Sequence, residues 1–130
     1  MAIEKEVYHF IPKLEKRLGY SMAWKVGDTI YVGGTVSIDE RGRIVGEGDG
    51  AAQARQIYAN IRKALAHFGA DLGNIVEQWF FFQDPEKEEE ILEAIKEEFA
   101  GLDYPPAVGF AGNQLALPEL LVEIKVTARV

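Results

Sequence analysis

The alternation of apolar and polar residues predicts one β-strand early in the chain and another at its end. Residues 28–38 read DTIYVGGTVSI. One face of this strand is expected to carry the apolar residues Ile30, Val32, Val36 and Ile38. The opposite face is expected to carry Thr29, Tyr31, Thr35 and Ser37. Gly33 and Gly34 interrupt the strand, which indicates a β-bulge or a close approach of backbone or ligand.

The strand at the end of the chain, residues 119–130, alternates more strongly. Its apolar face is formed by Leu120, Val122, Ile124, Val126 and Val130. Its polar face carries Glu123, Lys125, Thr127 and Arg129. Directly after the early strand, DERGR at 39–43 predicts a turn, and IVGEG at 44–48 predicts a short strand that returns along the first.

Residues 50–68 have the apolar spacing of an amphipathic helix. Asp49 is the expected N-cap, and Gly69 is the expected left-handed residue just past the end. The buried stripe of this helix is predicted to be Ala54, Ile57, Tyr58, Ile61, Leu65 and Phe68.

A second helix is predicted over residues 84–101, with Asp84 as cap, Pro85 in the first turn and Gly101 at the end. Its buried stripe is expected to be Ile91, Leu92, Ile95 and Phe99. The acidic run at 88–90 lies near the positive end of the helix dipole, so we interpret it as a solvated face.

Between the helices, residues 75–83 (IVEQWFFFQ) predict a strand with aromatic side chains on both faces. Trp79 and Phe81 lie on one side of it, and Phe80 and Phe82 on the other. The elements therefore read ββαβαββ, an α+β sandwich with two helices packed on one sheet. Two helices cover only one face of a sheet, and a second aromatic face left in water is unfavourable.

A second copy of the same sheet is the simplest cover for that other face, which predicts a homo-oligomer with its sites at the subunit seams. The alternative is that the N-terminal segment, residues 1–18, folds over the same face. We expect one domain over residues 1–130, with residues 1–16 as an N-terminal extension.

Composition narrows the classes of function. The net charge of -7 disfavours nucleic acid as a partner, because an acidic surface repels phosphates. The chain has no cysteine and only two histidines, His9 and His67, so neither thiol chemistry nor a histidine metal site is expected. No apolar run is long enough to cross a membrane, and the N-terminus lacks the apolar core of a signal peptide. We expect a soluble, cytoplasmic protein with no membrane partner.

Three stretches together resemble the Rid family, also called the YjgF family. They are GYSMAWKVGDTIYVGG at 19–34, AAQARQIYANI at 51–61 and LPELLVEIKVTA at 117–128. The resemblance spans roughly residues 17–128. It implies a chorismate-mutase-like fold and a homotrimer, a barrel-like assembly with three clefts between subunits. It also implies hydrolysis of reactive enamines and imines to keto acids and ammonia, with no cofactor.

The resemblance also suggests cleft residues. Tyr20 matches the family's cleft tyrosine, and Gly34 matches the glycine of its second-strand motif, although Gly33 replaces the serine that usually precedes it. Glu123 matches the acidic residue of the last strand and is the candidate catalytic group. Such a carboxylate can orient the attacking water or relay its proton. Trp79 is a further candidate, as an apolar wall.

The segment Tyr104–Ala107 departs from the family pattern. Deaminating members carry an arginine after a proline and a small residue, where it grips the substrate carboxylate through two parallel hydrogen bonds. Ala107 stands at that place here, followed by the uncharged Val108. We place Ala107 and Val108 among the ligand-binding candidates.

Three hypotheses follow. The first is a homotrimer that binds a small, mostly apolar or uncharged metabolite, either as a hydrolase or deaminase on a non-standard substrate or as a ligand-binding module only. The second is a conventional enamine/imine deaminase that takes its cation from Lys125 or Arg129. The third is a non-catalytic binding or interaction module.

Overall fold

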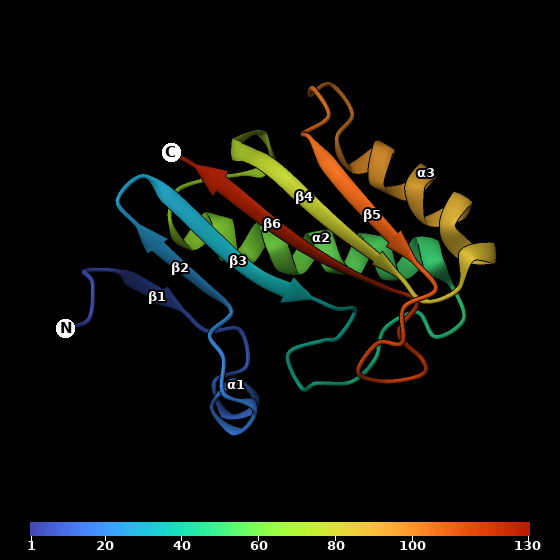
Figure 1. Ribbon diagram of the computed structural model, residues 1–130, viewed down its shortest axis with the longest axis horizontal. Coiled ribbons are helices and arrows are strands. Elements are labelled where there is room, and N and C mark those ends of the chain that lie inside the picture. Colours follow the sequence, from blue (N-terminus) through green and yellow to red (C-terminus); the bar gives the residue numbers. More distant parts are fainter.

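A computed structural model describes residues 1–130. Its centre is one mixed sheet of six strands in the order β1-β2-β3-β6-β4-β5 (Figure 1). All strand pairs are antiparallel except β4 with β5. The strands are β1 (Glu6–Tyr8), β2 (Ala23–Val26), β3 (Thr29–Thr35), β4 (Ile75–Phe82), β5 (Ala107–Ala111) and β6 (Val122–Arg129). The helices are α1 (Pro12–Leu18), α2 (Gly50–His67) and α3 (Glu88–Glu98), with short 3-10 turns at Leu72–Asn74 and Pro85–Lys87.

The long helices α2 and α3 lie on one face of the sheet, which confirms the predicted α+β class and the ββαβαββ order from β2 to β6 (Figure 1). The core lies between this face and the two helices. Its members include Ile30, Val32, Ile57, Ile61, Leu65, Phe82, Ile91, Phe99, Val122 and Ile124. The short helix α1 is an addition to the predicted pattern.

Both predicted helix starts are confirmed. The Asp49 side chain accepts a hydrogen bond from the backbone N–H of Ala52, as an N-cap does. Asp84 accepts one from the N–H of Glu86, although a 3-10 turn precedes α3 proper. Gly69 and Gly101 both adopt positive φ, the conformation predicted for the residues that end these helices.

The predicted returning strand at 44–48 is wrong. That segment makes only one isolated bridge, between Ile38 and Ile44, and β3 pairs instead with the upstream strand β2. Gly27 and Asp28 form the tight turn between β2 and β3, with Gly27 at positive φ. A hairpin closed over two residues brings its strands together at a lower entropic cost than the longer loop at 39–43.

The two faces predicted for residues 28–38 are correct only as far as Val32. The pairing register between β3 and β6 shifts between Val32 and Thr35, so the expected bulge at Gly33 and Gly34 is present. Because a bulge adds one residue to the strand, side chains beyond it change faces. Thr35 and Ser37 are buried, at 4% and 0% exposure, although both were predicted on the polar face. Val36 and Ile38 are only partly buried.

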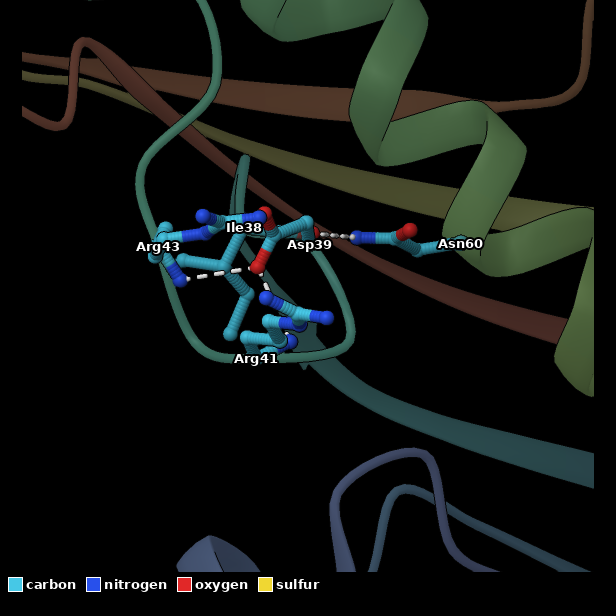
Figure 2. A network of polar contacts seen from close by, with 5 residues as sticks. All are labelled: Ile38, Asp39, Arg41, Arg43 and Asn60. Atoms are coloured by element: carbon cyan, nitrogen blue, oxygen red, sulfur yellow. Dashed lines mark hydrogen bonds and ion pairs between the residues drawn. The ribbon is translucent and has the colours of Figure 1, made fainter.

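Two buried polar residues of α2 tie loops to the helix. The amide nitrogen of Asn60 donates to the carbonyl oxygen of Ile38, just past the end of β3 (Figure 2). It also donates to the carbonyl oxygen of Val36. Gln53 donates to the carbonyl of Glu119 and accepts from the N–H of Leu121, just before β6. These bonds give the AAQARQIYANI stretch a structural role, because they fix where β3 ends and β6 begins.

Figure 2 also shows the loop that follows β3. The Asp39 carboxylate accepts hydrogen bonds from the backbone N–H groups of Arg41 and Arg43, and it pairs with the Arg43 guanidinium at 3.0 Å. This loop is the turn predicted at 39–43, and it is held by the Asp39 side chain and by a backbone hydrogen bond from the N–H of Asp39 to the carbonyl oxygen of Arg43.

The N-terminal segment joins the sheet and does not cover its second face. β1 pairs with β2 at the sheet edge. Tyr8 and Phe10 pack toward the core on the α2 side, and the rings of Tyr8 and His67 lie 5.1 Å apart. On the second face, here called the open face, Tyr31 and Trp79 are 49% and 41% exposed. No helix of the chain is long and apolar enough to cross a membrane.

Candidate functional site

The open face is aromatic, with a small group of polar side chains near its centre. Strand register places Trp79 beside Lys125 on one side and Val108 on the other. In the next row, Phe81 lies between Glu123 and Phe110, and the rings of Phe81 and Phe110 stack with centroids 5.5 Å apart. Both faces of this part of β4 are therefore aromatic, as the sequence predicted, and only the helix side is covered.

Glu123 lies beside the bulge of β3. Two bulge residues, Gly33 and Gly34, face the single residue Lys125 of β6, because Val32 pairs with Val126 and Thr35 with Ile124. A Cβ atom added at Gly34 would collide with the Glu123 carboxylate. Glycine at position 34 therefore leaves the space that this carboxylate occupies.

The Glu123 carboxylate is half-buried, and burial raises its pKa above the ordinary value. Desolvation is the sole cause of that shift, so no hydrogen bond or nearby cation offsets it. A carboxyl group with a raised pKa, held beside an open surface, is a candidate general acid or base.

Tyr20 lies within electrostatic reach of Glu123. Burial raises the pKa of its phenol, and the charges of Glu15 and Glu123 raise it further. Tyr20 is 43% exposed, so its ring is accessible from the open side of the chain. The structure thus brings together Tyr20, Gly34 and Glu123, three residues that are far apart in the sequence.

A cavity of about 790 Å³ lies next to this group. Its lining includes Tyr20, Gly33 and Lys125, together with the aromatic rings of Trp24 and Tyr31. The Lys125 ammonium forms no salt bridge, and its one hydrogen bond is a long contact of 3.5 Å to the carbonyl of Val32. Arg129, the other candidate cation, pairs with Asp28 at 2.6 Å at the end of the sheet.

The remaining sequence candidates lie elsewhere. Trp79 and Val108 are on the open face, but strand β6 separates them from the bulge of β3. Ala107 pairs with Gln78, whose side chain is buried on the helix side. Ala107 borders a separate pocket of about 580 Å³ beside α3, together with Tyr104 and Phe99. Within one chain, Ala107 and Glu123 therefore lie on opposite faces of the sheet.

One residue of the site gave no signal in the sequence. Glu15 is a glutamate in a charged stretch, KLEKR, and looks like any solvated helix residue. In the structure it is 1% exposed and contacts the loop that carries Tyr20. Only tertiary contacts distinguish it from its charged neighbours.

No group of three or more acidic or histidine side chains is placed to hold a metal ion. The site offers the carboxylate of Glu123, the phenol of Tyr20 and the ammonium of Lys125, next to the aromatic rings of Trp24 and Tyr31. Together with the fold, it defines a class of small α+β proteins in which two helices cover one face of a mixed sheet and the other face is open.

The comparison with family models identifies the family. The model described as Endoribonuclease L-PSP matches residues 11–130, and the chain belongs to this family, the Rid/YjgF family. The resemblance noted in the sequence is confirmed.

Relatives and solved structures agree with this assignment. A RutC family protein of Pyrococcus abyssi is 34% identical over 126 residues, which is 95% of this chain and 96% of that protein. The 3-aminoacrylate deaminase RutC of Acinetobacter baylyi is 30% identical over 111 residues, or 85% of this chain and 86% of that protein. The crystal structure of Rv2704, a YjgF family member from Mycobacterium tuberculosis, superposes with a TM-score of 0.85 at 28% identity, covering 98% of this chain and 100% of that one.

Proposed function

We propose that this protein is a hydrolytic deaminase of small enamines or imines that works in clefts between the subunits of a homotrimer. The observation that carries the proposal is the Glu123 carboxylate, which is half-buried, has a raised pKa and is seated against Gly34 beside Tyr20. A similarity of 30% to a 3-aminoacrylate deaminase supports the reaction class.

The chemistry needs one acid–base group and one water. An enamine first takes a proton on carbon and becomes an imine. Glu123 accepts a proton from water as the water oxygen attacks the imine carbon, and it then returns the proton to nitrogen. The hydroxyl proton of the resulting carbinolamine then moves to nitrogen as the C–N bond breaks, so that imine and water become a carbonyl compound and ammonia. A raised pKa suits a carboxyl group that must both accept and donate a proton near neutral pH.

Trimer formation would complete the site. Trp79, Tyr31 and Phe110 expose between 41% and 49% of their surface in a single chain, on the same face as Glu123. An aromatic face of this kind is typical of an interface between subunits. Covering it would remove water from around Glu123, which strengthens every electrostatic interaction in the cleft.

The test is release of ammonia from freshly generated 2-aminoacrylate. Glu123→Gln should reduce kcat/KM by about 10²–10⁴-fold, the usual loss for a general acid–base group. Glu97→Gln is the matched control, because Glu97 is an exposed carboxylate of α3 on the far side of the sheet. An unchanged rate in Glu123→Gln would refute the proposal. Ligand-dependent melting without turnover in the wild type would support the binding-module hypothesis instead.

The charges near the cavity bear on whether the substrate carries a carboxylate. Ala107 supplies no charge, which suits an uncharged substrate, but Lys125 places an ammonium without a salt bridge in the cavity beside Tyr20. A substrate carboxylate could pair with it. This observation favours the second hypothesis, a deaminase of anionic enamines with Lys125 as its cation, and it argues against Arg129, which is already paired with Asp28.

Two matched substrates, one with a carboxylate and one without, test whether Lys125 binds a substrate carboxylate. Lys125→Met should raise KM for a carboxylated imine by about tenfold or more, the effect of losing a charged hydrogen bond, and should leave KM for the matching carboxamide imine unchanged. Lys13→Met, at an exposed position of α1, is the control. Equal effects on both substrates would mean that Lys125 does not select for a carboxylate.

A further inference from the structure

We propose that Glu15 is a positioning residue that holds the Tyr20 loop and the Gly33–Gly34 bulge in place around Glu123. The inference rests on the proposed function for its kinetic consequences. Its structural part concerns one buried carboxylate and the backbone groups that it binds.

Both carboxylate oxygens of Glu15 accept hydrogen bonds from backbone. One oxygen accepts from the N–H of Ile11 at 2.6 Å, and the other from the N–H of Met22 at 2.6 Å. The second oxygen also lies 2.9 Å from Nδ1 of His9. The side chain is 1% exposed, so these partners replace the water that it loses on burial.

The backbone of Glu15 fixes Tyr20 directly. Its carbonyl oxygen accepts from the N–H groups of Gly19 and Tyr20, at 2.8 and 3.0 Å. Gly19 has a φ of 83°, which lets the chain turn sharply out of α1 at that point. The Glu15 carboxylate then anchors Met22 on the far side of the loop. Tyr20 is therefore held between two hydrogen-bonded points that both belong to Glu15.

The same residue connects to the bulge. The carbonyl of Met22, whose N–H binds Glu15, accepts a hydrogen bond from the N–H of Gly33 at 2.8 Å. The next residue, Gly34, lies against the Glu123 carboxylate. A continuous path of contacts therefore leads from the Glu15 side chain through β2 and β3 to the candidate catalytic group.

Electrostatics agrees with this geometry. After burial, the Glu15 charge is the next largest cause that raises the pKa of the Tyr20 phenol, followed by the charge of Glu123. Two carboxylates thus act on one phenol from different elements. A phenol is already protonated at neutral pH, so the effect of the Glu15 charge is a measurable upward shift in the pKa of Tyr20.

A carboxylate is required at this position because both backbone partners are donors. A glutamine amide has one accepting and one donating end, so Glu15→Gln would turn an N–H group toward the N–H of either Ile11 or Met22. The loop would then shift even though the side chain keeps its size. Glu15→Gln is consequently the informative variant, and Glu15→Ala is its more disruptive partner.

The experiment measures kcat and KM with 2-aminoacrylate for Glu15→Gln, together with the melting temperature. Displacing the Tyr20 loop should reduce kcat/KM by roughly 10- to 100-fold, mainly through kcat. The control is Ile95→Val, a core substitution in α3 that lowers stability without contact to the loop. If Ile95→Val loses as much rate for the same loss of melting temperature, the positioning role is refuted.

A second readout does not depend on turnover. The Tyr20 phenol is titrated by NMR of ring-labelled tyrosine, with its signal assigned through Tyr20→Phe. In Glu15→Gln the pKa should move down toward the ordinary value of 10.0, and the amide signals of Gly33 and Gly34 should shift. If the wild type shows no turnover, these shifts alone support the positioning contact while the proposed function fails. Unchanged titration and unchanged glycine signals would overturn the inference.

Discussion

The two faces of the sheet carry similar apolar side chains in different surroundings. On the helix side, Phe82, Val122 and Ile124 are at most 2% exposed, and Tyr58 donates to Gln78 to satisfy a buried amide oxygen. On the open side, Trp79 and Tyr31 remain 41% and 49% exposed. The comparison shows that one chain completes its core on one face and leaves the other face exposed, and this exposed face is the one that we propose a partner subunit covers.

The polar groups of the two faces differ in the same way. On the helix side, Gln53 donates to the backbone carbonyl of Glu119, and Asn60 donates to that of Ile38. On the open side, Glu123 has a raised pKa and no hydrogen-bond partner. The side chains of Gln53 and Asn60 thus find their hydrogen-bond partners within the chain, and the carboxylate of Glu123, the group expected to carry chemistry, does not. Four experiments test this difference between the two faces.

The largest effect is expected on the helix side. Phe82→Ala removes a ring that is 2% exposed and should destabilise folding by about 3–5 kcal/mol, because it leaves a cavity in a close-packed core. Urea unfolding measures the change. A loss below about 1 kcal/mol would mean that this face is less tightly packed than its burial indicates.

Trp79→Glu tests the open side. Burying a carboxylate in a subunit interface is unfavourable, so the variant should sediment as a monomer while its circular dichroism stays native. Leu102→Glu is the control, since Leu102 has a similar exposure of 44% in the loop after α3. A wild-type chain that is already monomeric would refute the proposed trimer.

A substitution at the contact between the bulge and Glu123 is expected to have a smaller effect on stability. Gly34→Ala should destabilise folding by about 1–3 kcal/mol, as overpacked sites do, because the new Cβ collides with the carboxylate. In a Glu123→Ala background the same substitution should have almost no effect on stability. A double-mutant cycle measures this coupling, and additive effects would show that the contact is absent.

The smallest expected effect is on the pH dependence of folding stability. Because the pKa of Glu123 is raised on folding, the folded state holds this proton more tightly than the unfolded state. Stability should therefore fall as pH rises from the ordinary value of 4.5 through the raised one. Glu123→Gln lacks this dependence and should melt higher than the wild type at neutral pH, with no advantage in acid. A wild type that melts higher at neutral pH would mean that Glu123 has stabilising partners.

Much of the fold could be predicted from the sequence, because helix caps and strand alternation depend on residues that are close together in the chain. Asp49 and Asp84 cap their helices as predicted, and the alternation in 119–130 gave the correct faces of β6, although its terminal residue Val130 is 50% exposed. Caps depend on neighbours two or three residues away, and alternation depends on the chain's own pleat. The family resemblance, carried by the same motifs, added the architecture.

The candidate site could be predicted from the sequence only in part. Tyr20, Gly34 and Glu123 come together, but Ala107 lies on the opposite face from Glu123, and Glu15 gave no warning of its burial. Side-chain contacts across 100 residues of sequence depend on strand order and register. A single sequence contains no direct record of either.

Propensity and periodicity in the sequence predicted the two long helices, the faces of β6 and of β3 as far as Val32, and the aromatic character of β4. They did not predict the short helix α1. The tertiary structure alone decided that β2 and not 44–48 pairs with β3, and that the bulge buries Thr35 and Ser37. It also decided that Glu15 supports the Tyr20 loop. These outcomes depend on competition between distant segments for the same partners, and burial and hydrogen bonding over the whole chain decide that competition.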